Sequence, residues 1–412
     1  MAPNDSAETN GEATGTVVGR RKAARYIVPF AVAGVAAATI GLVPALADSG
    51  DPELPDITAQ ELIEKIAASD EEQLSGTVKV STDLGIPSLG GLAGSFAPGG
   101  GQGESTASPD AKLMELASGT HTLRIAADGP DKQRLSILGE GSEYSLVHNG
   151  DDIWGYDSES NEVYHAESDG NERGGKAGER KAPKGVPATP KDLAEEVLAA
   201  AGDTTSVTVD GTSQVAGRDA YKLLIKPKQS GSTIGSVTVA VDASTGVPLK
   251  FTLAPSSGGK AAVDAGFTSV DFAKPDASSF AFTPPEGAKV TEADELKAEA
   301  EKAGTADKAH KAHKDLGSLE DFKGLNVIGE GWNAVAAVEV PGGAGMPTQG
   351  SGDVPAQARQ FLDALGDKVS GDFGSGTVFK TRLVNALLTD DGKVYVGAVT
   401  EDTLVKAADA AE

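Results

Sequence analysis

Residues 146–157 read LVHNGDDIWGYD, and this stretch predicts two strands joined by a tight turn. Apolar and polar residues alternate on both sides of Asn149-Gly150, a pair that is typical of turns between strands. Trp154 and Tyr156 lie two residues apart, so both side chains point to the same face of their strand. The stretch is therefore typical of an antiparallel hairpin with an aromatic pair on one face.

The same period of two extends outward from this hairpin in both directions. Upstream, the alternating positions are Val78 and Val80, then His121, Leu123 and Ile125, then Leu135 and Ile137. Downstream, the pattern predicts strands over 206–209, 221–226, 237–242, 249–253 and 267–272. Alternation of this kind indicates an antiparallel meander with one apolar face. The fold class we predict is mainly β, of the α+β type.

Two amphipathic helices are predicted beside these strands. Thr58-Ala59-Gln60-Glu61 is a capping box, and it opens a helix to about Ala68 with one apolar stripe. A second helix is predicted over Pro190–Ala201, with a threonine cap before it and Gly202 after it. Each apolar stripe needs a partner, and the apolar face of the sheet supplies one.

A second globular unit is expected, because 412 residues exceed the roughly 250 to 300 at which a single core stops growing. Residues 292–314 are rich in Ala, Lys and Glu without an apolar stripe, which is typical of a solvated helical spacer. Beyond it the pattern predicts an amphipathic stretch over 354–365, a hairpin over 382–399 with its turn at Asp391-Gly392, and a short helix over 402–408.

Composition excludes several classes of partner and chemistry. The 36 basic and 61 acidic residues leave a net charge of −25, which repels phosphate backbones, so nucleic acid is excluded as a partner. The chain has no cysteine. That excludes disulfides, thiolate catalysis, thiolate metal sites and lipid attachment to a cysteine.

The segment Arg20–Ala47 predicts export across a membrane. A basic cluster at its start precedes Tyr26–Ala47, which carries no charge and is followed by an acidic flank. The positive side stays in the cytoplasm, so everything downstream is expected to be extracytoplasmic. Ala45-Leu46-Ala47 is a cleavage signal, but the apolar run also reaches the roughly 20 residues of a membrane-spanning helix. The protein is therefore either secreted after cleavage near Ala47 or membrane-associated through an N-terminal anchor.

No motif nominates a catalytic residue, a metal site or a cofactor. Gly170–Lys176 has the spacing of a phosphate-binding loop, but Ala177 stands where a hydroxyl is required. His310 and His313 lie one helical turn apart and could hold a metal, although their lysine-rich surroundings favour a solvated helix face. The carboxylates are scattered through predicted loops, where solvation explains them. We therefore expect no enzyme activity.

Three segments carry a resemblance to a known family. They are 146–157, the pair 215–223 and 239–249 with the turn Asp-Ala-Ser-Thr-Gly, and 280–288, which reads FAFTPPEGA. In this order they resemble the LolA-like superfamily, which includes the outer-membrane lipoprotein carrier LolA and the amino-terminal domain of the RseB/MucB sigma-factor regulators. The composition is similar to that of actinobacterial exported proteins. The resemblance implies an unclosed antiparallel half-barrel with a helical lid that holds acyl chains.

The resemblance completes the expected domain organisation. It comprises a disordered cytoplasmic tail over 1–19, a signal peptide or membrane anchor over 20–47, a LolA-like half-barrel over 54–288 with a flexible insert over 85–111, a charged helical spacer over 289–315 and a small α+β domain over 316–412. The insert carries scattered apolar residues, and it is either a flap over an apolar opening or a disordered loop. It is far longer than the usual connection of about 4 to 6 residues.

The same resemblance implies which residues line a cavity. With the helices at 58–68 and 190–201 as the lid, the candidate lining residues are Trp154, Tyr156, Tyr221, Leu223, Ile225, Val239, Val241 and Phe251. The alternative is that they form an ordinary core beneath the helices. The predicted function is extracytoplasmic, non-enzymatic binding of a lipid acyl chain or a lipoprotein. One alternative is a RseB/MucB-like envelope-stress sensor that binds an anti-sigma factor, a membrane-bound regulator, and another is a structural cell-envelope module with a filled core.

Overall fold

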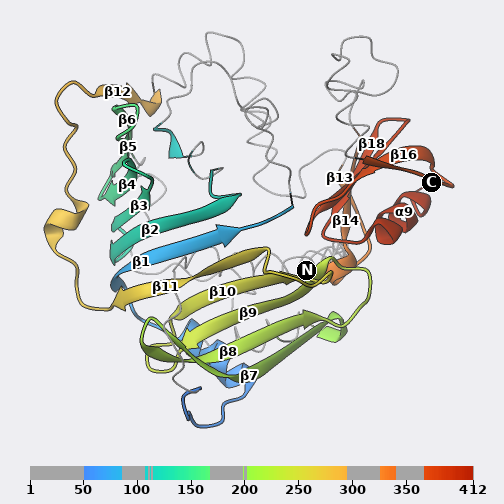
Figure 1. Cartoon of the computed structure of the whole chain (residues 1–412), viewed down its shortest axis with the longest axis horizontal. Helices are drawn as coiled ribbons and strands as arrows, with labels where there is room; N and C mark the ends of the chain where they lie inside the picture. The colour runs from blue at the N-terminus through green and yellow to red at the C-terminus, as the bar shows by residue number, and fades with distance from the viewer. Residues whose placement is uncertain are drawn as a thin grey trace, which may run out of the picture.

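The computed structural model describes residues 51–85, 107–109, 112, 115–167, 198, 202–294, 325–339 and 366–411. Within them the chain forms two antiparallel sheets with few helices (Figure 1). The larger sheet is not closed into a barrel. The predicted fold class, mainly β with a large antiparallel sheet that is not closed, is confirmed.

The larger sheet has twelve strands in the order β12-β6-β5-β4-β3-β2-β1-β11-β10-β9-β8-β7. The first six in sequence are β1 (Gln73–Thr82), β2 (Gly119–Asp128), β3 (Lys132–Leu138), β4 (Glu143–Asn149), β5 (Asp152–Asp157) and β6 (Glu162–Glu167). The others are β7 (Thr205–Val215), β8 (Arg218–Pro227), β9 (Ile234–Asp242), β10 (Pro248–Pro255), β11 (Val263–Asp271) and β12 (Lys289–Glu292). Pairing of β1 with β11 joins two meanders into one surface.

One face of this sheet is apolar across both meanders. Directly paired residues on neighbouring strands point to the same face. One such row runs from β7 to β1 through Val209, Leu223, Val239, Phe251, Ala265 and Val80. A second runs from β4 to β11 through Tyr144, Ile137, Leu123, Val78 and Phe267. Because Val78 and Val80 lie two residues apart on β1, both rows belong to the same face.

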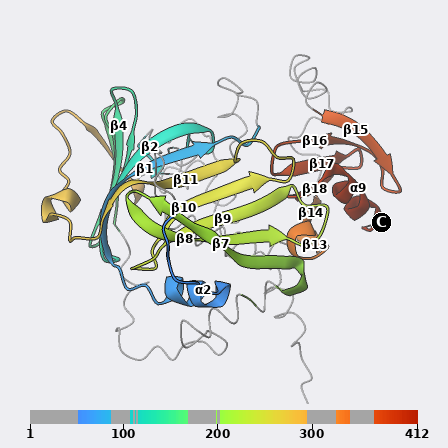
Figure 2. The same cartoon turned by 60° about the horizontal axis from the view of Figure 1, so that its bottom comes forward.

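Helix α2 (Ala59–Ala67) covers part of that face, as Figure 2 shows below β7 and β8. Its predicted capping box is present: Thr58 N donates to Glu61 Oε2 at 2.8 Å, and Glu61 N donates to Thr58 Oγ1 at 3.2 Å. Leu62 and Ile63 are buried against the sheet. Of the second predicted helix, only Leu198 is described; it is helical and packs against the same residues.

After β11 the chain crosses the β3–β6 part of the sheet as a strap, defined here as residues 276–292. Figure 1 shows it running through the 3-10 helix η2 (Ala277–Phe280) to β12. Strand β12 pairs with β6 in parallel, so the sheet extends past the boundary predicted at residue 288. At this edge Lys289 Nζ also lies 2.9 Å from Glu162 Oε1. Residues 295–324 of the predicted spacer lie outside the described residues.

The second unit, described over residues 325–339 and 366–411, contains a six-stranded antiparallel sheet. Its order is β13 (Leu325–Ile328), β14 (Val335–Glu339), β18 (Lys393–Gly397), β17 (Asn385–Thr389), β16 (Gly374–Phe379) and β15 (Gly366–Gly371). Helix α9 (Glu401–Asp409) packs on it through Leu404, Ala407 and Ala408. The predicted hairpin and short helix are confirmed, and Gly392 takes a positive φ of 92° in the turn.

Several predictions fall on residues that the structure does not describe. These are the tail and export segment over 1–47, the amphipathic stretch over 354–365, His310, His313 and most of the insert over 85–111. Of the insert, Ala107 is fully buried, and its carbonyl accepts a hydrogen bond from the Tyr144 hydroxyl at 3.1 Å. None of the helices within the described residues is long and apolar enough to span a membrane.

Candidate ligand-binding site

Six of the eight predicted lining residues meet in one place, the α2 cluster. Its buried members are Leu62, Ile63, Tyr221, Leu223, Ile225, Val237, Val239, Val241 and Trp332, each at most 9% exposed. Phe251 is partly buried and packs against them. Strand pairing brings the lining residues together, because Leu223 faces Val239 and Tyr221 faces Val241 across β8 and β9.

The polar atoms of the α2 cluster have partners within the protein. The Tyr221 hydroxyl donates to the Pro55 carbonyl at 2.9 Å, in the segment that leads into α2. The indole Nε1 of Trp332 donates to Thr205 Oγ1 at 2.8 Å. Everything else in the cluster is aliphatic. The arrangement therefore suits contact with an apolar chain, since a buried polar ligand group would find no free partner there.

The other two predicted lining residues lie on the opposite face of the sheet. Tyr144, which belongs to the apolar face, pairs with Asp157, so the neighbouring Tyr156 and Trp154 point the other way. The strap covers them there: Phe282 lies 5.6 Å from Trp154 and 5.8 Å from Tyr156 between ring centroids. The structure thus brings six of the predicted lining residues together in the α2 cluster and places Trp154 and Tyr156 on the other face of the sheet.

His165 lies beside Trp154, at the point where the strap joins the sheet edge. The two rings stack with centroids 3.8 Å apart and planes 15° from parallel. His165 Nδ1 lies 2.7 Å from Glu292 Oε2 on β12, and Nε2 lies 3.0 Å from Asp152 Oδ1 on β5. Burial lowers the pKa of His165, but the two carboxylates outweigh it and leave the pKa raised above its ordinary value. The imidazolium therefore bridges β12 to β5.

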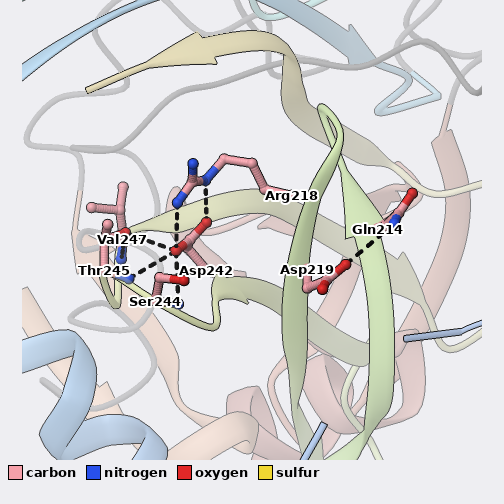
Figure 3. A network of polar contacts seen from close by, with 7 residues as sticks. All are labelled: Gln214, Arg218, Asp219, Asp242, Ser244, Thr245 and Val247. Carbon is pink, nitrogen blue, oxygen red and sulfur yellow. Dashed lines mark hydrogen bonds and ion pairs between the residues drawn. The ribbon is translucent and has the colours of Figure 1, made fainter. Parts of the chain in front are cut away.

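A buried ion pair fixes the turn on which α2 rests (Figure 3). The Asp242 carboxylate, 1% exposed, accepts two hydrogen bonds from Arg218, one of them from Nη2 at 3.0 Å. It also accepts from the backbone amides of Ser244 at 2.9 Å and Thr245 at 2.8 Å. Burial raises the pKa of Asp242, yet these bonds outweigh it and the pKa lies below its ordinary value. The segments around Arg218 and Asp242 that carry the family resemblance therefore have a structural role here.

Gly246 shows how closely this turn approaches the helix. Its φ is +78°, and an added Cβ would meet the backbone carbonyl oxygen of Lys65, near the end of α2, at a separation that real Cβ atoms do not show. Glycine is required there both for the backbone conformation and for the close approach. The β9–β10 turn and α2 are thus in direct backbone contact.

Trp332 is the member of the α2 cluster that sequence reasoning missed. It lies in the 3-10 helix η3 (Gly331–Asn333) of the second unit and is 5% exposed. Its hydrogen-bond partner, Thr205, is 127 residues away in sequence, so no local pattern connects them. One signal was available, because the chain has only 2 tryptophans and large aromatic residues are rarely left without a packing partner.

Polar contacts dock the second unit beside the α2 cluster. Thr233 N donates to the Ala398 carbonyl at 3.0 Å, and Thr400 N donates to the Gly231 carbonyl at 2.7 Å. Arg382 N donates to the Leu84 carbonyl at 2.8 Å, and its Nη1 lies 2.7 Å from Asp83 Oδ2. These contacts place the second unit at one end of strands β8 and β9, with Trp332 reaching into the apolar cluster.

Metal chemistry has no candidate site in the part of the chain that the structure describes. There, no group of three or more His, Asp or Glu side chains is placed to hold an ion. The cluster around His165 has one histidine and two carboxylates, but hydrogen bonds between them account for its geometry. The α2 cluster is therefore the candidate site.

Comparisons with known proteins find similar folds only. No family model matches this chain, and no curated protein matches it significantly in sequence. A chain of the MucA/MucB complex from Pseudomonas aeruginosa is 15% identical with a TM-score of 0.37, and the match covers 85% of this chain and 96% of that one.

Two further solved structures match a little over half of the chain. A LolA superfamily protein from Nitrosomonas europaea is 10% identical with a TM-score of 0.20, covering 55% of this chain and 99% of that one. An uncharacterized conserved protein from Thermus thermophilus is 13% identical with a TM-score of 0.31, covering 57% and 98%. Because the identities and TM-scores are low, we draw no conclusion on function from these matches.

Proposed function

We propose that this chain, whose open antiparallel sheet has a LolA-like fold, is an extracytoplasmic, non-enzymatic protein that binds the acyl chain of a lipid or a lipoprotein. The observation that carries the proposal is the α2 cluster. There, a short helix covers one part of an apolar face that continues across the sheet from β7 to β4. We assign the site to the six clustered lining residues.

Helix α2 has the properties expected of a movable lid. It is 9 residues long, which is marginal for an isolated helix, and it is held to the sheet chiefly by Leu62 and Ile63. A ligand that enters beneath it would replace helix–sheet contacts with chain–sheet contacts. The apolar surface then stays buried throughout, so opening need not expose the cluster to water.

The expected affinity follows from burial of methylene groups. Each buried CH₂ contributes about 0.8 kcal/mol, so roughly ten of them supply about 8 kcal/mol before the lid is displaced. A free energy of that size corresponds to a dissociation constant of about 1 µM. Fatty acyl chains of ordinary length therefore suffice, and no charged headgroup contact is required.

Native purification tests the proposal. The chain from Asp48 to Glu412 is purified without detergent and extracted with organic solvent, and the extract is examined by mass spectrometry for lipids. We expect a co-purifying acyl lipid and saturable uptake of a fluorescent fatty acid by the delipidated protein. Repeated absence of lipid, together with no uptake, would defeat the proposal.

The docked second unit supports a second candidate function, an envelope-stress sensor that binds a membrane-bound regulator. A carrier needs only the ligand site, whereas here a separate sheet contributes Trp332 to it. Cross-linking in native membranes tests this candidate through capture of a single membrane protein whose yield changes when fatty acid is added. A yield that fatty acid leaves unchanged would favour the carrier.

The extracytoplasmic location is part of the proposal and rests on the segment Arg20–Ala47. Amino-terminal sequencing of the protein from its natural membrane fraction tests it. A mature terminus at Asp48 indicates a released protein, and an intact terminus in the membrane fraction indicates an anchored one. Recovery of the intact chain from the cytoplasmic fraction would contradict both.

A further inference from the structure

We propose that the indole of Trp332 occupies one end of the acyl-chain site, so that ligand binding and docking of the second unit compete. This inference rests on the proposed function and adds its regulation. A bound chain would expel Trp332 from the α2 cluster, and removal of the indole would strengthen chain binding.

The α2 cluster is elongated along strand β8. Trp332 lies at the end of the cluster next to Thr205, the first residue of β7. On β8 the lining residues Tyr221, Leu223 and Ile225 follow one another every second residue, which spans about 13 Å along the strand. Tyr221 marks one end, where its hydroxyl reaches the segment before α2. At the other end, Thr205 pairs with Pro227, two residues beyond Ile225, and Thr205 binds the indole of Trp332.

Trp332 differs from the rest of the interface between the two units. Within the described residues it is the one member of the second unit in the α2 cluster. The other polar contacts between the units in the described part of the chain are made by 230–233, Asp83, Leu84 and Lys260 of the first unit with Asn333, 382–400 and Thr403 of the second. An apolar ligand competes with the indole for buried apolar surface. It has no donor or acceptor with which to replace the polar contacts. The displacement can therefore begin at the indole of Trp332, and the adjacent hydrogen bond from Asn333 Nδ2 to the Ser230 carbonyl, 2.9 Å long, has to be released with it.

The docking of η3 also carries one unfavourable feature, which favours its release. Asn333 Oδ1 is buried, and the part of the chain that the structure describes offers it no hydrogen-bond partner. Burial of an unpaired acceptor opposes docking. Gly331 takes a φ of +60° and lies so close to Thr204 that an added Cβ would be 3.0 Å from its hydroxyl. The segment is thus docked tightly, but not with every group satisfied.

Thermodynamic linkage turns this competition into a measurable coupling. If the acyl chain weakens docking of Trp332, docking of Trp332 must weaken binding of the acyl chain by the same factor. A partner that holds the second unit in place would then lower the affinity for lipid. A partner that prefers the released unit would raise it. The coupling between ligand binding and docking of the second unit is therefore negative, which means that each weakens the other.

Fluorescence of Trp332, recorded in a variant that lacks Trp154, tests the displacement. The chain has 2 tryptophans, so Trp154→Phe leaves Trp332 as the one emitter. Palmitate, which does not absorb at the excitation wavelength, is titrated while emission and acrylamide quenching are recorded. We expect the emission maximum to move to longer wavelength and the quenching constant to rise at least twofold. Trp332→Phe, which leaves Trp154 as the emitter, is the matched control for changes elsewhere.

Affinity measurements test the reciprocal effect. We expect Trp332→Ala to bind a fluorescent fatty acid several-fold more tightly than the natural chain, with Trp332→Phe between the two. If Trp332→Ala fails to fold by circular dichroism, Thr205→Val takes its place with the same expected direction. This variant removes the hydrogen bond to the indole together with the hydrogen bond between the Thr205 and Thr204 hydroxyls.

The outcomes separate this inference from the proposed function. Palmitate binding that leaves the emission and quenching of Trp332 unchanged overturns the competition and leaves the proposed function standing. A weaker affinity of Trp332→Ala for the fluorescent fatty acid likewise overturns the competition and leaves the proposed function standing. Absence of palmitate and fluorescent fatty acid binding in the natural chain overturns both.

Discussion

Leu223 and Leu224 are adjacent on β8 and point to opposite faces of the sheet. Leu223 belongs to the buried α2 cluster, whereas Leu224 is partly exposed on the other face. This pair separates a loss of ligand contact from a general loss of strand packing, because the same deletion is made twice on one strand.

We predict that Leu223→Ala weakens fatty acid uptake at least fivefold, while Leu224→Ala changes it less than twofold. The larger effect at Leu223 follows from lost methylene contacts with the bound chain, each worth about 0.8 kcal/mol. Titration with a fluorescent fatty acid measures both, and urea denaturation monitors stability. Equal losses in the two variants would mean that the chain does not lie against the α2 cluster.

His165 supplies a prediction of pH dependence. Its pKa is raised in the folded state because Asp152 and Glu292 stabilise the imidazolium more than burial opposes it. A raised folded pKa means that the stabilisation is fully present below the unfolded pKa of about 6.5 and is lost as the pH rises through the folded pKa. We therefore expect β12 to detach more readily as the pH rises above about 6.5 and through the folded pKa of His165.

Hydrogen exchange of the β12 amides between pH 6 and pH 8, corrected for the intrinsic rate, measures this effect. Protection should fall as the pH rises. His165→Gln, which keeps a side chain that can form hydrogen bonds but does not titrate, should remove the pH dependence. If the natural chain and the variant gave parallel pH profiles, the imidazolium bridge would have no role.

At the scale of elements, the position of α2 depends on the turn between β9 and β10. Arg218 and Asp242 hold that turn in place, and the turn in turn touches the last residues of the helix. A buried pair of this kind is strongly unfavourable to break, because the remaining partner keeps an uncompensated charge. The β9–β10 turn therefore supports the end of α2 from a fixed position.

Gly246→Ala and Gly258→Ala form a matched test of that contact. Both glycines have a φ of +78°, but an added Cβ at Gly258 meets nothing within 4 Å. Each variant carries the strain of a left-handed residue, about 1 to 2 kcal/mol. We expect Gly246→Ala to lose a further 1 kcal/mol or so of unfolding free energy, since overpacking adds to the strain. Urea denaturation measures the difference, and identical losses would show that the turn does not support α2.

At the scale of the whole molecule, the two units share one apolar cluster. Trp332 comes from the second unit, and the nine buried members of the cluster otherwise come from α2, β8 and β9. Removal of the second unit therefore uncovers apolar surface on the first. A truncated chain is a poor test of lipid binding for this reason, and point variants at Trp332 are the better choice.

We predict that a chain ending at residue 294 unfolds at a lower urea concentration than the chain ending at Glu412 and binds the dye ANS in its folded state. The exposed cluster residues account for both effects, because ANS reports accessible apolar surface. Addition of palmitate should reduce the ANS signal by occupying the same surface. Equal urea midpoints and no ANS binding would indicate that the units are independent.

Local sequence determined much of the fold, because strands, turns and caps depend on near neighbours. Alternation predicted strands β1 to β5 and β7 to β11 of the larger sheet, but not β6 or β12. Thr58 and Glu61 predicted the capping box of α2, and Asp391-Gly392 predicted the turn between β17 and β18. Each of these signals lies within a few residues of the element that it specifies. The clustering of Tyr221 with Leu223 and Ile225 followed from the same period of two.

Only the tertiary structure decided which residues share a surface. Period-two alternation predicts that Trp154 and Tyr156 share a face of the sheet. The register of the strands between them and β8 shows that Leu223 and Val239 lie on the other face. The parallel pairing of β12 with β6 and the burial of Trp332 beside Thr205 likewise join segments more than 120 residues apart. The physical reason is that a face or an interface is set by long-range register and docking, and neither leaves a local pattern in the chain.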